Sequence, residues 1–164
     1  MFDCIKANVS NPRDDGALTD FLLKILRGEA NDGSGLIYGM GHAVYTKSDP
    51  RAVLLKHYAR GLAEKNGYGE DFALLESIER LSPDLFNAYK GTDRALCANV
   101  DLYSGLIYRM LRIPVCMYTP LFALARVAGW CAHRMEEFCT GKKIIRPGYK
   151  CIAPERCYTP LEAR

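Results

Sequence analysis

The stretch N-V-D-L-Y-S-G-L-I-Y-R-M-L-R-I-P, from Asn99 to Pro114, has the pattern of a short helix with one buried face. Asn99 suits the N-cap position, because its side-chain oxygen can accept a hydrogen bond from a free backbone N–H of the first turn. Apolar residues then recur at spacings of three and four, at Leu102, Leu106, Ile107, Met110 and Leu111. Pro114 cannot continue a helix. The stretch therefore predicts a helix that packs on a hydrophobic core.

Amphipathic patterns of the same kind lie on both sides of this stretch. They cover approximately residues 14–28, 48–67, 72–83 and 119–141. Ser48 or Asp49 is expected to cap the second, which has Pro50 in its first turn, and Pro83 is expected to end the third. We find no period-two pattern of useful length and no internal repeat, so the sequence predicts an all-α fold.

Composition places the chain among globular proteins. Of its 164 residues, 49% are hydrophobic and 25% are charged, close to the averages for folded domains. The 22 basic and 19 acidic residues give a formal net charge of +3 and are interspersed along the chain. Nucleic-acid-binding domains usually show a clustered basic excess, so we expect no nucleic-acid partner.

The cysteines do not form a metal-binding or disulfide pattern. There are seven, an odd number, with no C-x-x-C pair and no histidines at zinc-finger spacing. We therefore expect free thiols, no metal site and a cytoplasmic location. The most apolar stretch, 113–130, is interrupted by Pro114, Pro120 and Arg126, and it predicts no membrane span.

A glycine-rich segment, G-M-G-H, contains the first candidate for chemistry. Gly39 and Gly41 follow a short apolar run, but Val44 stands where a dinucleotide-binding fingerprint would have its third glycine. What remains is His42, at a point where two glycines leave the backbone open to a ligand. Taken alone, His42 could equally be a histidine hydrogen-bonded within its loop.

Other charged residues occupy positions that a purely structural role explains less well. Arg51 lies in the first turn of a helix, where the helix dipole disfavours a cation, so anion binding would explain it. Asp101 starts the helix after Asn99, where a simple capping carboxylate is the alternative. Arg126 lies in an apolar helix face, and Arg146 could be an ordinary loop cation.

Four motifs together resemble the citrate synthase family, in the order in which the family has them. They are G-M-G-H-A-V-Y with S-D-P-R-A (39–52), N-V-D-L-Y-S-G (99–105), F-A-L-A-R-V-A-G-W-C-A-H-R (122–134) and I-I-R-P (144–147). The similarity extends from about Gly16 to the carboxy terminus. It implies an all-α fold in which a small helical domain closes over a large one in a homodimer. Residues 1–115 would be mainly the small domain, and 116–164 the last helix and tail of the large domain.

The resemblance also implies an activity and a set of roles. The family condenses acetyl-CoA with oxaloacetate to give citrate and CoA, without a further cofactor. Asp101 would remove a methyl proton of the acetyl group, and His42 would hydrogen-bond the oxaloacetate carbonyl. The carboxylates of oxaloacetate would be held by Arg51, Arg126 and Arg146, the last in the site of the other subunit. CoA would contact Leu36, Ile37, Gly39, Gly41 and Asn99.

Two departures from the family limit what the resemblance implies. Ala43 stands where many members have an arginine, which bears on the contacts with the CoA phosphates. The family also uses two histidines upstream of the glycine loop, and residues 1–41 contain none. His57 and His133 do not match these roles and are expected to be structural. We therefore expect the chain to be inactive by itself.

Several readings of the function stay open from the sequence. One is part of a citrate synthase. Another is part of a 2-methylcitrate synthase, because acetyl-CoA and propionyl-CoA differ by a single methylene group. A non-catalytic module that binds an acyl-CoA or a dicarboxylate, or that mediates dimerisation, is a third. A citrate synthase-like module of an ATP-citrate lyase fits S-D-P-R-A and N-V-D-L-Y-S-G less closely.

Overall fold

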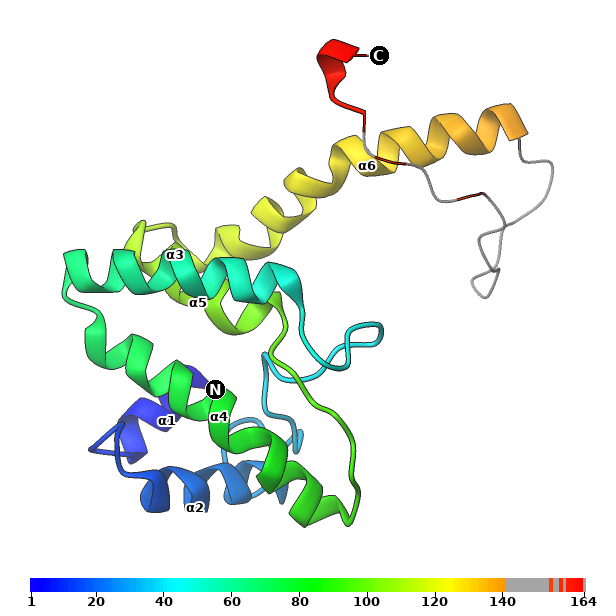
Figure 1. Ribbon diagram of the computed structural model, residues 1–164. Coiled ribbons are helices and arrows are strands. Elements are labelled where there is room, and N and C mark those ends of the chain that lie inside the picture. Colours follow the sequence, from blue (N-terminus) through cyan, green and yellow to red (C-terminus); the bar gives the residue numbers. More distant parts are fainter. Residues whose placement is uncertain (141–153, 155–156, 158, 164) are drawn as a thin grey trace. The chain divides into compact units, whose positions relative to one another are not determined.

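The structure is a computed structural model that describes residues 1–140, 154, 157 and 159–163 (Figure 1). Its helices are α1 (Phe2–Asn8), α2 (Asp15–Leu26), α3 (Pro50–Asn66), α4 (Gly69–Lys90), α5 (Val100–Met110) and α6 (Tyr118–Thr140), with 3₁₀ turns at Val115–Met117 and Leu161–Ala163. The described residues contain no strand, and their one β contact is an isolated antiparallel bridge between Met40 and Ala98. The expected all-α fold is confirmed.

The chain divides into two compact units, Met1–Pro120 and Leu121–Arg164. The first unit holds α1 to α5, and the second holds most of α6 and the residues after it. The assignment of 1–115 to a small domain and of 116–164 to a large one stays a prediction.

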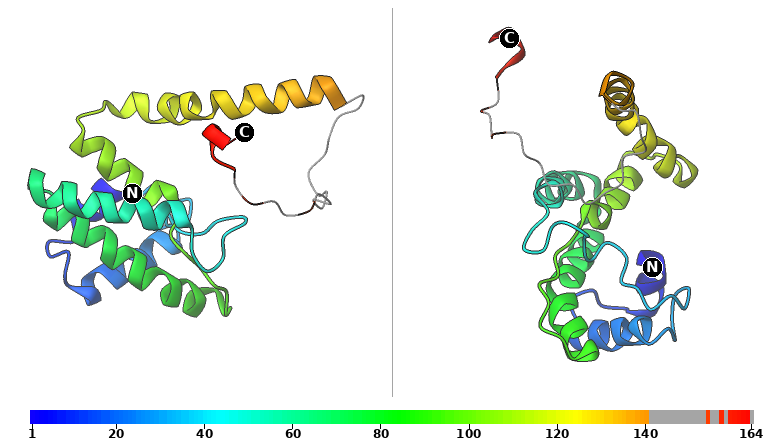
Figure 2. Two further views of the ribbon diagram at one scale, coloured as in Figure 1. Left: turned by 45° about the horizontal axis from the view of Figure 1, so that its top comes forward. Right: turned by 90° about the vertical axis from the view of Figure 1, so that its right-hand side faces the viewer.

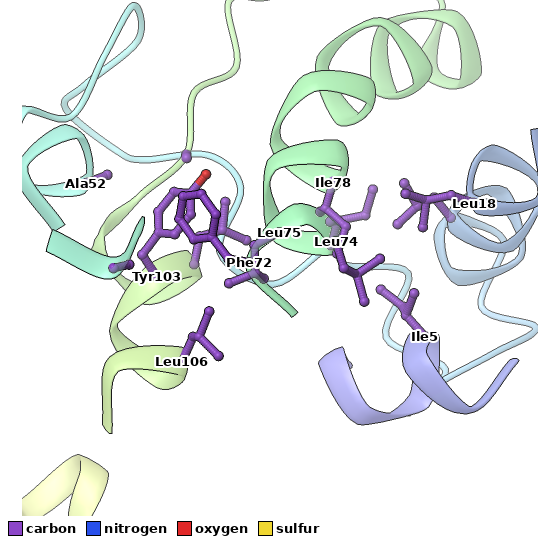
Figure 3. Packing of buried hydrophobic residues seen from close by; sticks show 14 of the residues in the cluster. Ile5, Leu18, Ala52, Phe72, Leu74, Leu75, Ile78, Tyr103 and Leu106 are labelled. Carbon is purple, nitrogen blue, oxygen red and sulfur yellow. The ribbon is translucent and has the colours of Figure 1, made fainter. Parts of the chain in front are cut away.

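The core of the first unit is built around α4. Figures 1 and 2 show α4 with α2 on one side and the α3–α5 pair on the other, and α4 contacts all three helices. In Figure 3, Leu74 and Ile78 of α4 lie towards Leu18 of α2, while Phe72 lies beside Tyr103 of α5. Each fully buried leucine or isoleucine contributes about 1.5–3 kcal/mol, so this contact region accounts for much of the stability of the unit.

The predicted starts of α2, α3 and α5 are confirmed by their caps. The Asp14 carboxylate accepts a hydrogen bond from the Ala17 N–H at 3.1 Å, and the Asn99 side chain accepts one from the Asp101 N–H at 2.9 Å. Of the two candidate caps of α3, Asp49 is the one that accepts from a backbone N–H of the first turn. These short-range bonds explain why cap residues marked the boundaries correctly.

The prediction that Pro83 ends a helix is wrong, because α4 continues through it to Lys90. Proline inside a helix costs about 3 kcal/mol, since it lacks an N–H and crowds the preceding turn. Here Ile78 and Leu85 are both buried, on either side of the proline, so core packing holds both halves of the helix in line. The neighbouring Ser82 hydroxyl, fully buried, donates to the Ile78 carbonyl at 2.6 Å.

Two further segments differ from the sequence-based expectation. The short helix α1 and the 3₁₀ turn Leu161–Ala163 were not predicted from the sequence pattern. Most of the remaining tail lies outside the described residues.

The segment Val115–Thr140 is long and apolar enough, by length and composition, to cross a membrane. The predicted interruption at Pro114 and Pro120 does not occur, because both prolines lie near the start of the segment, where a missing N–H breaks no helical bond. Length and composition alone are also typical of a helix that packs inside a protein. The segment carries charges at Arg126, Arg134 and two glutamates, which a lipid environment would disfavour.

Candidate functional site

The glycine loop is joined by hydrogen bonds to the segment that leads into α5. The Gly41 N–H donates to the Cys97 carbonyl, and the Asn99 N–H donates to the Gly39 carbonyl, both at 2.8 Å. The Asn99 side-chain amide adds a third bond, to the Gly41 carbonyl at 2.8 Å. His42 and Asp101 are 59 positions apart in the sequence, and these contacts bring together the residues that directly precede each of them.

Gly39 is required where the loop passes over α5. Its φ is +89°, and a Cβ atom there would lie 2.8 Å from the Cα of Leu102. Any larger residue would therefore push the loop off the helix.

His42 is oriented by the backbone of its own loop. The N–H groups of Val44 and Tyr45 lie 3.0 and 3.1 Å from His42 Nδ1, so this nitrogen is an acceptor. A neutral imidazole has one acceptor and one donor nitrogen, and the hydrogen-bond network therefore assigns the proton to Nε2. The Tyr45 ring packs against the imidazole, with 4.9 Å between the ring centroids.

Arg51 is held beside His42 by Asp49. Arg51 Nε donates to Asp49 Oδ1 at 3.0 Å, and Nη2 donates to Oδ2 at 2.8 Å. The same Nη2 lies 3.2 Å from His42 Nε2, and the guanidinium lies 5.5 Å from the centroid of the Tyr45 ring. The hydrogen bond from Arg51 lowers the pKa of the Asp49 carboxyl, and the same bond raises the pKa of Arg51.

The contact between Arg51 and His42 leaves both groups as donors. Guanidinium has no acceptor, and the proton of His42 is on the nitrogen that faces it. Neither can satisfy the other, so both can donate to an oxygen atom of a ligand. The arrangement is therefore suited to a carbonyl or carboxylate oxygen.

Asp101 is exposed in the first turn of α5 and lies close enough to influence Arg51. The pKa of Arg51 is raised mainly by its bond to Asp49, and the negative charge of Asp101 adds to the effect. Asp101 also lines a largely apolar pocket of about 320 Å³, together with Tyr38, Gly39 and Gly105. The structure thus brings His42, Arg51 and Asp101 into one region of the first unit.

The predicted CoA-binding residues fall into two groups. Leu36 is exposed, whereas the Ile37 side chain is buried in the core, so Ile37 could offer a ligand only its backbone. Gly39, Gly41 and Asn99 form the hydrogen bonds between the loop and α5.

The two remaining candidates belong to the second unit. Arg126 belongs to the second unit, where its guanidinium lies 4.5 Å from the centroid of the Phe122 ring. Arg146 lies outside the described residues.

Asp49 belongs to the candidate site, although the sequence predicted it only as a helix cap. Its side chain is fully buried although it is charged, and both of its oxygens contact Arg51. The available signal was the D-P-R sequence itself, in which an acid precedes the arginine by two residues.

Comparison with known proteins shows the family to which the chain is similar. Residues 2–148 match the family model for the citrate synthase C-terminal domain. A citrate synthase of Synechocystis sp. is 41% identical over 129 residues, which cover 78% of this chain and 31% of the relative. One from Corynebacterium glutamicum is 38% identical over 167 aligned positions, covering 100% of this chain and 34% of the relative. The chain spans about a third of the length of these relatives.

Solved structures give the same result. The citrate synthase of Pyrobaculum aerophilum superimposes with a TM-score of 0.65 at 30% identity, covering 99% of this chain and 37% of that one. The enzyme of Thermoplasma acidophilum gives a TM-score of 0.64 at 28% identity, over 99% of this chain and 42% of that one, and was solved with carboxymethyl coenzyme A and oxaloacetate. Family model, relatives and structures thus agree on the family, and this chain belongs to the citrate synthase family, whose C-terminal domain it matches.

Proposed function

We propose that this chain is the part of a citrate synthase that carries the base and the carbonyl-binding histidine of the condensation of acetyl-CoA with oxaloacetate. The observation that supports it most directly is the paired donor arrangement of His42 Nε2–H and Arg51 beside Asp101. A dicarboxylate with a ketone offers the oxygens that such donors require.

In the proposed reaction, the Asp101 carboxylate removes a proton from the methyl group of acetyl-CoA. The resulting enolate carbon attacks the ketone carbon of oxaloacetate, and the ketone oxygen, hydrogen-bonded by His42 Nε2–H, takes that proton and becomes the hydroxyl of the product. Water then cleaves the thioester to give citrate and free CoA. Positioned proton transfer of this kind contributes about 10²–10⁴-fold to a rate.

Arg51 is proposed to bind one carboxylate of oxaloacetate. Asp49 occupies Nε and one hydrogen of Nη2, so the hydrogens of Nη1 and the second hydrogen of Nη2 are those that can face a ligand. Arg126 and Arg146 are proposed to hold the remaining carboxylate oxygens. The backbone at 36–41, with Asn99, is proposed to contact CoA.

A second candidate is a module that binds a dicarboxylate or an acyl-CoA without turning it over. It is favoured by one observation: the residues that line the pocket beside Asp101 include no histidine that could donate to the thioester oxygen during enolisation. Loss of one such donor typically lowers the rate about 10²–10³-fold.

A chimaera distinguishes the two. The chain replaces the matching C-terminal third of the Synechocystis citrate synthase, and release of the CoA thiol is measured from acetyl-CoA or propionyl-CoA with oxaloacetate. We expect turnover by the chimaera, none by the chain alone, and a loss of about 10³-fold on Asp101→Ala. The preferred acyl-CoA separates citrate from 2-methylcitrate synthesis.

Asp84, an exposed aspartate of α4, supplies the matched control. Asp84→Ala should leave turnover unchanged. A folded chimaera that binds oxaloacetate but shows no turnover would support the binding module, and full activity of the Asp101→Ala chimaera would remove Asp101 as the base.

A further inference from the structure

The Asp49 carboxylate does more than begin a helix. Its side chain is fully buried, and it accepts three hydrogen bonds, from the Arg51 backbone N–H at 3.0 Å, from Nε at 3.0 Å and from Nη2 at 2.8 Å. Burying a carboxylate is unfavourable unless it is paired and hydrogen-bonded, and here both oxygens are occupied. Both carboxylate oxygens of Asp49 are bonded to Arg51, so neither is directed at a ligand there.

The other helix caps show that a cap alone does not need this arrangement. Asp14, at the start of α2, is exposed and accepts one backbone N–H, with no arginine on it. Asn99 caps α5 with a neutral amide. What distinguishes Asp49 is the fork-shaped contact with a guanidinium.

The contact with Asp49 holds the Arg51 guanidinium beside His42. Nη2 lies 3.2 Å from His42 Nε2, and with the proton assigned to Nε2 by the two bonds to Nδ1, the two groups face each other as donors and do not attract. His42 cannot turn away without losing the Val44 and Tyr45 N–H groups on Nδ1. The Asp49 carboxylate attracts the guanidinium and so keeps it beside the imidazole until a ligand oxygen accepts hydrogen bonds from both groups.

We propose that Asp49 is a positioning residue of the oxaloacetate site, which acts through Arg51 and does not touch the ligand. The proposal rests on the proposed function for the identity of the ligand. The placement of Arg51 can be tested without any ligand.

The first measurement uses the full chain and the Nε–H signal of Arg51 in ¹H–¹⁵N NMR, assigned by its loss in Arg51→Lys. We expect a distinct, slowly exchanging signal in the unchanged chain. Asp49→Asn and Asp49→Ser both keep an oxygen that can cap α3, but neither can pair with guanidinium as a carboxylate does. The signal should merge with those of free arginines in both variants and persist in Asp14→Asn, the matched cap control.

The second measurement is oxaloacetate affinity, followed by NMR titration. Asp49→Asn should weaken binding about tenfold, while Asp14→Asn should not change it. Because the effect passes through Arg51, it should disappear when Asp49→Asn is introduced into Arg51→Lys. A purely structural effect of Asp49 would persist in that background.

The outcomes separate the inference from the function on which it rests. A protected Arg51 signal in a folded Asp49→Asn chain, or equal affinity for oxaloacetate, overturns the positioning role. Should Asp49→Asn fail to fold, the same criteria apply to Asp49→Ser, and unfolding of both assigns Asp49 to the fold alone. If the unchanged chain does not bind oxaloacetate but loses its Arg51 signal on Asp49→Asn, the positioning of Arg51 stands and the proposed ligand is wrong.

Discussion

At the scale of single residues, the chemistry of this chain depends on contacts that fix each group's hydrogen-bonding role. His42 carries its proton on Nε2, the nitrogen that faces Arg51, because two backbone N–H groups donate to Nδ1. Gly39 allows the loop to lie on α5 only because it has no Cβ atom. Residue type alone therefore identifies candidates, and their contacts determine what they can do.

Gly39→Ala should strongly destabilise the first unit. The new methyl group would lie 2.8–2.9 Å from three atoms of Leu102, and φ is +89°. Overpacking of about 1–3 kcal/mol together with about 1–2 kcal/mol for the backbone predicts a loss of about 2–5 kcal/mol in the free energy of unfolding. Urea unfolding measures it. Gly61→Ala, in α3 with open space around the position, is the control and should be neutral or slightly stabilising.

The carboxylate of Asp49 should make stability depend on pH. Its pKa in the folded chain is lowered by the hydrogen bond from Arg51, below the value of about 3.9 expected when unfolded. The stabilisation is therefore complete above the unfolded pKa and is lost as the pH falls through the folded one. The difference in unfolding free energy between the unchanged chain and Asp49→Asn should be largest near pH 6 and shrink towards pH 3. A difference that stays constant with pH would contradict this.

At the scale of helices, α3, α4 and α5 meet at one polar junction at the edge of the core. The buried Tyr103 hydroxyl of α5 donates to Glu79 of α4, and Lys56 of α3 donates to the same Glu79 oxygen at 2.6 Å. Burial, and then the hydrogen bond to Glu79, raise the pKa of Tyr103 strongly. One carboxylate thus connects three helices.

Tyr103→Phe should reduce the alkaline sensitivity of the fold. An unfolded tyrosine ionises near pH 10, so the neutral, buried Tyr103 stabilises fully below that pH and progressively less above it. Near neutral pH the substitution should cost about 1 kcal/mol for the lost hydrogen bond. Thermal unfolding between pH 8 and 11 tests this, with Tyr89→Phe, at an exposed position of α4, as the comparison. Equal pH profiles for the two variants would show that Tyr103 does not control the transition.

The helices differ in how far the sequence could predict them. Helix starts with Asp14, Asp49 and Asn99 followed from local cap chemistry, which lies within a few residues. The continuation of α4 through Pro83 could not be predicted, because buried contacts distant in sequence outweigh the local cost of proline. The helix α1, with seven residues and Ile5 as its only buried one, is too short for periodicity to detect.

The site was predictable in the same uneven way. The motifs selected His42, Arg51 and Asp101, which the structure brings into one region. The pairing of Arg51 with Asp49 was not predicted: the D-P-R sequence hinted at it, but no helical or strand periodicity relates two residues at that spacing across a helix start.

At the scale of the whole molecule, one residue reports on the second unit separately from the first. Trp130 is the only tryptophan of the chain, and it lies in α6 with 55% of its surface exposed. No described residue of α6 is buried. Trp130 fluorescence therefore reports on the surroundings of α6, whereas far-ultraviolet circular dichroism reports on the helix content of the whole chain.

We expect Trp130 emission typical of a solvated indole, with little change across the urea transition that circular dichroism detects in the first unit. In the Synechocystis chimaera the emission should shift to shorter wavelength, if the rest of the enzyme covers the apolar face of α6. Coincident transitions by the two probes in the chain alone would indicate instead that both units unfold together.

The hydrogen bonds between the glycine loop and the Cys97–Asn99 segment have a consequence for timing. They join the residues that precede His42 to those that precede Asp101. Under the proposed function, a rigid-body movement of the first unit would carry the imidazole and the carboxylate to a substrate together. The speed of that movement would set how often the two groups meet their reactants, while their mutual alignment would be complete before it begins.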